Sequence, residues 1–266
     1  MSELTTDRIQ TRASDGIGWL TLNNPERRNA ISLDMWRGIG VALEAFQRDD
    51  AVRVVVMRGA GGQAFASGAD ISEFDHHRAN AEQRKAYGGV AAVAHDWLRR
   101  LDKPLLALIQ GFCIGGGLGV ALHADVRFAT PASRFAIPAA KLGLGYDHGA
   151  VAALARLIGA SAARDLLFSA RRVEADEAHR LGLINFLVAD DEIEARVVAY
   201  AKTIAGNAPL TLRAAKAALH AFEHPPITAA DETRLAALVD ACFDSEDYAE
   251  GRRAFAEKRP PKFRGR

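Results

Sequence analysis

Hydrophobic and polar positions in the first half of the chain follow strand-like and helix-like patterns in turn. Four stretches predict strands: 16–24, 52–62, 105–111 and 126–130. The stretch 52–62 (VRVVVMRGAGG) opens with a β-branched run, which is typical of a strand buried on both faces. Helical periodicity separates these strands over 29–50, with Ser32 as a candidate N-cap, and over 78–101, which Pro104 ends. This alternation predicts an α/β fold.

The second half of the chain changes character after residue 149. Residues 184–188 (INFLV) are its one predicted strand, and helical stretches are predicted over 191–206, 210–221 and 227–258. A helical tail this thin cannot bury its own apolar face, so we expect it to pack on the α/β core or on a neighbouring subunit. The sequence therefore predicts a core over 1–190 and a C-terminal helical region over 191–266.

Composition and charge narrow the functional classes. Of the 266 residues, 49% are hydrophobic and 25% are charged, which is typical of a globular chain. The 34 Lys and Arg residues nearly balance the 33 Asp and Glu residues, so bulk charge gives no support for binding nucleic acid or an anionic membrane. No secretory signal pattern or membrane-span pattern is present, and we expect a cytoplasmic protein. Cys113 and Cys242 have no metal-binding spacing, so we expect them to fill the core and no metal to be bound.

The most unusual local feature is the glycine triplet Gly115–Gly117 in FCIGGGLGVALHAD (112–125). Each glycine costs roughly 0.5–1 kcal/mol relative to alanine in a regular element, so a close backbone approach is expected. The triplet has neither the GK[ST] of a phosphate-binding loop nor the spacing of a dinucleotide site. A second small-residue loop, QAFASGADISEF (63–74), follows the predicted strand 52–62. Two such loops can each supply an N–H group to one carbonyl oxygen, whereas close helix–strand packing is the alternative explanation.

With both loops identified, the sequence resembles the enoyl-CoA hydratase/isomerase superfamily, also called the crotonase family. AFASGADISEF is similar to the family's A-G-A-D-I loop, and QGFCIGGGLGVALHADVRFAT is similar to its N-G-x-x-x-G-G-G segment. FAIPAAKLGLG, ARRVEADEAHRLGLINFLV and EGRRAFAEKRPPKFRGR match family stretches in the same order, so the resemblance spans nearly the whole chain. It implies a crotonase-like α/β spiral of ββα units with a C-terminal helical trimerisation region, and an acyl-CoA or enoyl-CoA thioester as substrate.

The resemblance also implies roles for individual positions. The N–H groups of Ala69 and Gly116 would form an oxyanion hole that polarises the thioester carbonyl, helped by the positive end of the helix after the triplet. Eight further positions would contact coenzyme A: Arg27, Arg28, Ser67, Gly68, Asp70, Ile71, Phe255 and Lys258, the last two often from a neighbouring subunit. A solvated charged turn is the alternative for the two arginines, and loop capping is the alternative for Ser67 and Asp70.

The sequence departs from the family at the two glutamates that hydratases use. In the matched motifs these fall at Gly119 and Ala139, neither of which can accept a proton. The nearest substitute is Asp147 in LGLGYDHGA (142–150), at a position where the dienoyl-CoA isomerase and chlorobenzoyl-CoA dehalogenase branches carry a working aspartate. N-capping of the following helix is the alternative role for Asp147.

Other titratable side chains complete the set of candidates. Tyr146 and His148 flank Asp147, and Tyr146 is included among the candidate catalytic residues together with Ala69, Gly116 and Asp147. Three histidines are expected at the surface: His76, His77 and His95.

The leading hypothesis is an enzyme of fatty-acid metabolism that stabilises the enolate of a CoA thioester. With both glutamates absent, isomerisation or another single-base reaction is favoured over standard hydration. Coenzyme A is part of the substrate, so no separate cofactor is expected. The alternatives are an acyl-CoA-binding protein that has lost catalysis and a serine hydrolase built on Ser67, for which no partner histidine is evident. By resemblance, we expect a homotrimer or a dimer of trimers.

Overall fold

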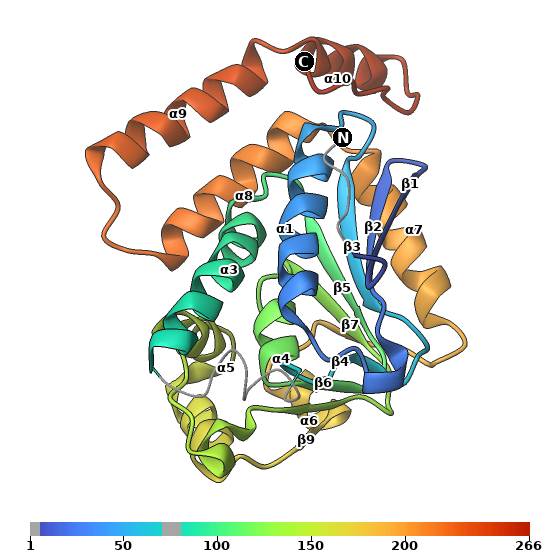
Figure 1. Cartoon of the computed structure of the whole chain (residues 1–266). Helices are drawn as coiled ribbons and strands as arrows, with labels where there is room; N and C mark the ends of the chain where they lie inside the picture. The colour runs from blue at the N-terminus through green and yellow to red at the C-terminus, as the bar shows by residue number, and fades with distance from the viewer. Residues whose placement is uncertain (1–5, 71–80) are drawn as a thin grey trace.

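The computed structural model describes residues 6–70 and 81–266 and contains two β-sheets (Figure 1). The large sheet has six strands in the order β1 (Ile9–Ser14), β2 (Ile17–Leu22), β3 (Val54–Gly59), β5 (Leu105–Ile109), β7 (Val126–Ala129) and β10 (Phe186–Leu187). The small sheet has four strands in the order β4 (Ala64–Ala66), β6 (Phe112–Ile114), β8 (Arg134–Ala136) and β9 (Val173–Glu174). The outer strands β1 and β9 pair antiparallel with their neighbours, and the other pairings are parallel.

The chain builds both sheets by repeating one unit, in which a strand of the large sheet, a strand of the small sheet and a helix follow one another. The helices of these units are α3 (Ala81–Arg100), α4 (Gly116–Ala121) and α5 (His148–Ser169). The helix α1 (Leu33–Arg48) instead follows β1 and β2 of the large sheet, and α6 (Ala175–Arg180) follows β9. The short 3-10 helices η1 (Pro25–Arg27) and η3 (Pro138–Leu142) lie in connections between these elements. The succession β3–β4–α3, β5–β6–α4 and β7–β8–α5 confirms the predicted α/β spiral of ββα units.

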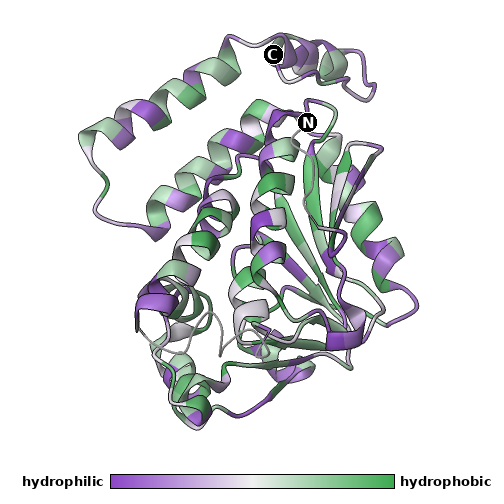
Figure 2. Cartoon of the chain, in the orientation of Figure 1, coloured by the Kyte–Doolittle hydropathy of each residue, from purple (hydrophilic) through white to green (hydrophobic). Residues whose placement is uncertain are grey.

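Both faces of the large sheet are covered, as the β-branched run in 52–62 predicts. Val55 and Met57 of β3 point into the cluster formed with α1 and α3, and the alternate residues Val54 and Val56 point into a second cluster with α7 (Ile193–Ala205). Figure 2 shows the hydrophobic residues concentrated in these central strands. A strand between two helical layers needs apolar side chains at every position, because its side chains alternate between the two faces.

Five short or polar strands were not predicted. The strands β4, β6 and β8 have three residues each and β9 has two, which is too short for an alternating pattern to be visible. The edge strand β1 exposes five of its six residues, so its sequence IQTRAS lacks an apolar face. These strands matter for the site, because β4 and β6 bring the two small-residue loops to adjacent positions of the small sheet.

Four helices form the C-terminal part of the chain: α7, α8 (Pro209–Glu223), α9 (Ala229–Phe243) and α10 (Glu246–Ala256). The single helix predicted over 227–258 is wrong, because the chain breaks at Ser245, whose hydroxyl caps α10 by accepting a bond from the Tyr248 amide. α7 packs on the large sheet, whereas α9 and α10 lie away from it at the top of Figure 1. No helix within 6–70 or 81–266 has the length and apolar character needed to cross a membrane.

Candidate active site

The loop that follows β4 is held against the start of α1 by a single parallel bridge between Ile31 and Ala69. Ile31 donates to the Gly68 carbonyl at 2.8 Å, and Asp70 donates to the Ile31 carbonyl at 3.0 Å. In a parallel bridge of this kind, the central residue turns its own N–H group away from the partner strand. The Ala69 amide therefore faces away from Ile31, toward the glycine triplet.

The glycine triplet lies directly beside this loop. A Cβ atom placed on Gly116 would be 3.5 Å from the Ala69 nitrogen, and one placed on Gly117 would be 2.3 Å from the Ala66 carbonyl oxygen. Gly115, the N-cap of α4, has φ +52° and ψ −118°, a conformation that L side chains rarely adopt. The close backbone approach expected for the triplet is thus an approach to the loop between β4 and Asp70.

The amides of Ala69 and Gly116 are adjacent and available. Within the described part of the chain, neither donates a hydrogen bond to a backbone or side-chain acceptor. Gly116 is the first residue of α4, where an N–H group has no partner within the helix. Because α4 has only six residues, the two amides themselves, rather than a long helix dipole, are what this site offers to an oxygen atom.

The predicted coenzyme A residues that precede α1 are tied to the same loop. The Arg27 Nη1 atom lies 3.1 Å from Oδ1 of the buried Asp70 carboxylate, so Asp70 forms an ion pair rather than only a loop cap. The Ser67 amide donates to the Arg28 carbonyl at 3.0 Å, and the Ser67 hydroxyl donates to the Arg27 carbonyl at 3.2 Å. The structure therefore brings together Arg27, Arg28, Ser67, Gly68 and Asp70.

Arg172 is a neighbour of this group that the sequence analysis did not single out. Its guanidinium carbon lies 5.6 Å from the centroid of the Phe112 ring, and that of Arg28 lies 5.0 Å from the same centroid. Arg28 and Arg172 are both exposed, so two positive charges lie at Phe112 of β6, the strand that pairs with β4 just before the loop that contains Ser67. The motif ARRVEADEA gives no signal for this placement, because Phe112 lies far away in the sequence.

Two predicted coenzyme A residues are not brought to this site within the chain. Phe255 and Lys258 lie at the end of α10 and are exposed, at the opposite end of the molecule from α4 in Figure 1. Ile71 lies outside the described residues, as do His76 and His77. Within one chain, the structure therefore supports only the N-terminal group of predicted coenzyme A contacts.

Asp147 is the N-cap of α5. Its Oδ1 atom accepts hydrogen bonds from the Gly149 amide at 2.9 Å and the Ala150 amide at 3.3 Å, which confirms the capping alternative without testing a catalytic role. His148, the first residue of α5, is exposed. The preceding residue, Tyr146, turns inward and reaches the triplet.

The Tyr146 hydroxyl lies next to Gly119, in the space that a side chain at position 119 would enter. The Tyr146 hydroxyl donates to the Gly115 carbonyl at 3.1 Å, and a Cβ atom placed on Gly119 would be 3.5 Å from that hydroxyl oxygen. Burial raises the pKa of Tyr146 to about 12, with smaller contributions from Cys113 and Asp147, so the phenol stays protonated at neutral pH. Ala139, in η3, packs with Tyr146 against the hydrophobic core.

The expectation that His95 lies at the surface is wrong. Its Nδ1 atom is 3.1 Å from Nε2 of His123, and its ring lies 4.9 Å from the Trp36 ring between α1 and α3. Burial lowers the pKa of both histidines, that of His123 to about 3, and the Asp147 carboxylate partly offsets the effect on His95. The pair is therefore neutral at neutral pH, with one ring nitrogen donating to the other.

The buried histidine pair predicts how stability depends on pH. Because the folded-state pKa of His123 is below its unfolded value of about 6.5, the unfolded chain takes up this proton first as the pH falls. The free energy of unfolding should therefore decrease below about pH 6.5, by up to about 1.4 kcal/mol per pH unit from this group. Urea unfolding of the wild type and of His123→Gln across this range measures the effect, and parallel profiles would show that His123 contributes nothing.

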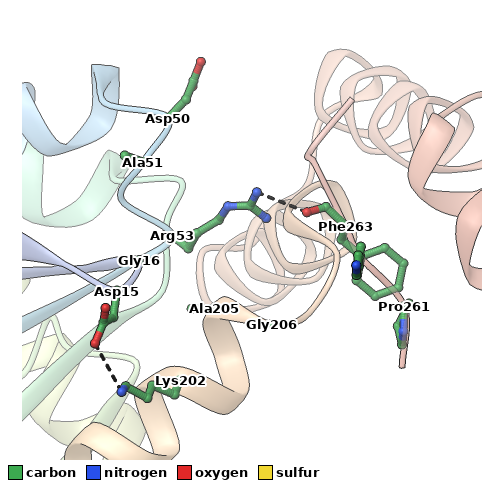
Figure 3. A pocket seen from close by; sticks show the side chains of 11 residues that line it. Asp15, Gly16, Asp50, Ala51, Arg53, Lys202, Ala205, Gly206, Pro261 and Phe263 are labelled. Carbon is green, nitrogen blue, oxygen red and sulfur yellow. Dashed lines mark hydrogen bonds and ion pairs between the residues drawn. The ribbon is translucent and has the colours of Figure 1, made fainter. Parts of the chain in front are cut away.

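A separate cavity of about 560 Å³ lies at the other end of the large sheet (Figure 3). It is lined by Gly16 and Arg53, which precede β2 and β3, and by the C-terminal segment, whose Phe263 carbonyl accepts a hydrogen bond from Arg53 at 3.2 Å. Ligands of parallel sheets bind beyond the carboxyl ends of the strands, where the loop at Ala69 and the triplet lie. No group of three His, Cys, Asp or Glu residues in the described segments is placed to hold a metal ion.

Comparison with known proteins agrees with this architecture. The profile of the family described as enoyl-CoA hydratase/isomerase matches residues 12–266. A short-chain-enoyl-CoA hydratase of Clostridium acetobutylicum is 33% identical over 243 residues, which cover 90% of this chain and 91% of that protein. A carnitinyl-CoA dehydratase of Salmonella typhi is 31% identical over 250 residues, covering 93% and 94% of the two chains.

Solved structures show the same fold. An enoyl-CoA hydratase/carnithine racemase from Magnetospirillum magneticum has a TM-score of 0.92 and 41% identity, covering 98% of this chain and 97% of that one. The two sheets, the ββα units and the adjacent loops thus define an α/β protein of the crotonase fold. The chain belongs to the enoyl-CoA hydratase/isomerase family.

Proposed function

We propose that the protein is an enzyme that binds an acyl-CoA or enoyl-CoA thioester and stabilises its enolate. The observation that carries the proposal is the pair of amides at Ala69 and Gly116, which come from two different loops, lie close together and donate to no acceptor within the described residues. Two N–H donors aimed at one oxygen favour the charge that develops on a thioester carbonyl when its α-proton is removed. Coenzyme A is part of the substrate, and the chemistry requires no other cofactor.

The cationic groups near the loop support binding of the anionic coenzyme A moiety. Arg28 and Arg172 place two guanidinium groups over the Phe112 ring, on the strand that pairs with β4, and guanidinium groups bind phosphates through several N–H donors. Arg27, which is ion-paired with Asp70, fixes the loop rather than offering an unpaired charge. Phe255 and Lys258 would contribute only from a neighbouring subunit.

We favour a single-base reaction, such as isomerisation, over standard hydration. The family resemblance puts the two hydratase glutamates at Gly119 and Ala139, which carry no carboxylate, and the Tyr146 hydroxyl lies in the space next to Gly119. Two carboxylates are needed to activate water and to handle the α-proton separately. Asp147, which follows the matched stretch FAIPAAKLGLG and begins α5, is the carboxylate that we propose for the single base.

A measurement of α-proton exchange tests this proposal directly. Saturated acyl-CoA esters of increasing chain length are incubated with the protein in deuterated water, and deuterium at the α-carbon is followed by mass spectrometry. Exchange without addition of water to the matching enoyl-CoA esters is the expected result. Tight binding with no exchange across the series would instead identify an acyl-CoA-binding protein, and rapid addition of water would identify a hydratase.

The apolar surface of the C-terminal helices predicts self-association. Phe222 of α8 is 78% exposed and Phe243 of α9 is 58% exposed, and apolar patches of this kind mark protein–protein interfaces. Together with the family resemblance, this supports a homotrimer or a dimer of trimers. Sedimentation at micromolar concentration should show one of these states, and Phe243→Asp should shift the distribution toward monomer; a wild-type monomer would contradict the prediction.

A further inference from the structure

Tyr146 makes one specific contact with the glycine triplet. Its hydroxyl oxygen lies 3.1 Å from the Gly115 carbonyl oxygen, to which it donates its single proton. The same carbonyl accepts a bond at 2.9 Å from the Gly119 amide within the first turn of α4. Both lone pairs of this carbonyl oxygen are therefore engaged.

The Gly115 carbonyl belongs to the same peptide group as the Gly116 amide. Resonance couples the two ends of a peptide group, so a hydrogen bond accepted by the oxygen draws electron density from the nitrogen and makes its N–H a stronger donor. The Gly116 N–H is one of the two donors of the site described above. The Tyr146 hydroxyl thus binds the carbonyl oxygen of the peptide group whose N–H group would bind the substrate oxygen.

The same contact fixes the orientation of this peptide group. Gly115 has φ +52°, and a glycine backbone is free to rotate where other residues are not. On its N-terminal side, Gly115 is anchored by its own amide, which donates to the Ala136 carbonyl at 2.8 Å. On its C-terminal side, the Gly115 carbonyl accepts one hydrogen bond from Gly119 within α4 and one from Tyr146, which lies outside that helix.

Gly119 is what allows Tyr146 to take this position. A Cβ atom at residue 119 would already be in van der Waals contact with the Tyr146 hydroxyl, at 3.5 Å. A longer side chain there, starting from that Cβ atom, would occupy the space that the hydroxyl now fills. The contact between Tyr146 and Gly115 therefore depends on the absence of a long side chain at position 119.

We propose that Tyr146 is a positioning residue that orients and polarises the Gly115–Gly116 peptide, so that the Gly116 N–H group binds the thioester oxygen more strongly in the enolate than in the ground state. This inference rests on the proposed function. Tyr146 acts through the backbone and does not itself transfer a proton, because its proton is already held by the Gly115 carbonyl. Burial, which raises the pKa of Tyr146, keeps this donor protonated at neutral pH.

The test uses the stretching frequency of the thioester carbonyl. An acyl-CoA ester labelled with ¹³C at the carbonyl is bound to the wild type, to Tyr146→Phe and to Tyr200→Phe, and infrared difference spectra are recorded. Tyr200→Phe is the matched control, since it removes the same hydroxyl from a ring that packs on Phe128 and Phe186 in the other hydrophobic cluster. The wild type and the control should both shift the band to lower frequency than free ester, and Tyr146→Phe should shift it less.

Kinetics provide a second readout on the same proteins. Removal of an oxyanion donor costs about 10²–10³-fold in kcat, and since the Gly116 donor is weakened rather than lost, Tyr146→Phe should lower kcat for α-proton exchange about tenfold. KM should stay within about threefold, because the interaction is stronger in the transition state than in the ground state. A ring-fluorinated tyrosine at 146, a stronger donor while protonated, should enlarge the infrared shift beyond that of the wild type.

The possible outcomes distinguish a failure of the proposed function from a failure of the inference about Tyr146. A wild type that binds the ester without any infrared shift would overturn the proposed function itself. A normal wild-type shift that is equal in Tyr146→Phe would overturn only the inference about Tyr146. An unchanged shift with a large loss of kcat would overturn it as well, because Tyr146 would then act directly on the substrate. The fluorinated variant keeps the test decisive if Tyr146→Phe does not fold, since a shift equal to that of the wild type would contradict the inference.

Discussion

Replacement of Asp147 by asparagine should reduce α-proton exchange roughly 10²–10⁴-fold, while the affinity for the CoA ester stays within about threefold. The expectation follows from the chemistry that remains at the site. Gly119 and Ala139 carry no proton acceptor, whereas Asp147 directly follows the tyrosine that reaches the triplet. A carboxylate at this place can take the α-proton and return it to another carbon.

Asparagine removes the charge of Asp147 but keeps an oxygen atom that can cap α5. The Asp147 Oδ1 atom accepts bonds from the Gly149 and Ala150 amides, and the amide oxygen of asparagine can accept the same bonds. Stability should therefore remain close to that of the wild type, whereas Asp147→Ala, which loses the cap, should cost about 1 kcal/mol. Urea unfolding measured beside the exchange assay separates the two contributions.

A capping role alone makes the opposite prediction. If Asp147 only begins α5, then Asp147→Asn exchanges the α-proton at the wild-type rate. That result in a folded protein would reject the catalytic role and direct attention to His148 as the base. The inference about Tyr146 is tested independently, because its infrared readout does not depend on which group removes the proton.

The central strands could be predicted because their environment is uniform. β3 lies between the helical layers of α1 with α3 and of α7, so every one of its first four residues is buried and apolar. A run of this kind has few alternative explanations. The helices α1 and α3 could be predicted as well, since each turns an apolar face toward these strands.

The contacts that complete the site could not be predicted from local patterns. The Tyr146 hydroxyl and the Gly115 carbonyl are 31 residues apart in the sequence. They meet because β6, which precedes the triplet, pairs with β8, which leads through η3 to Tyr146. The short strands of that sheet have no visible alternation. His95 was misplaced for a related reason, because helical periodicity shows which face is apolar but not that His123 stands opposite.

The pairing of Ala69 with Gly116 was inferred through family resemblance rather than from spacing. Small residues at both loops indicated a close approach, but either loop could have packed against a helix instead. The parallel bridge between Ile31 and Ala69 determines the direction of the Ala69 N–H group. An isolated bridge of this kind has no recognisable sequence pattern. The role of the two amides in catalysis stays a prediction, for which the geometry provides the support.

The second large effect is expected for Gly117→Ala. A Cβ atom at this position would lie 2.3 Å from the Ala66 carbonyl oxygen and 2.7 Å from the Ala66 Cβ atom, so the backbone of β4 or of α4 must move. Overpacking against backbone should lower the free energy of unfolding by about 3 kcal/mol. The movement also separates the Ala69 and Gly116 amides, and a displacement of about 1 Å at reacting groups can cost about 10²-fold in rate.

Gly119→Ala is the matched control for stability, because it adds the same methyl group two residues further along α4. The nearest atom to the new Cβ would be the Tyr146 hydroxyl oxygen at 3.5 Å, an ordinary contact, and alanine favours the helix by about 1 kcal/mol over glycine. The free energy of unfolding should therefore fall for Gly117→Ala and stay equal or rise for Gly119→Ala in urea titrations. Equal stabilities would mean that the triplet does not need its bare backbone at Gly117, and the close approach of the two loops would lose its explanation.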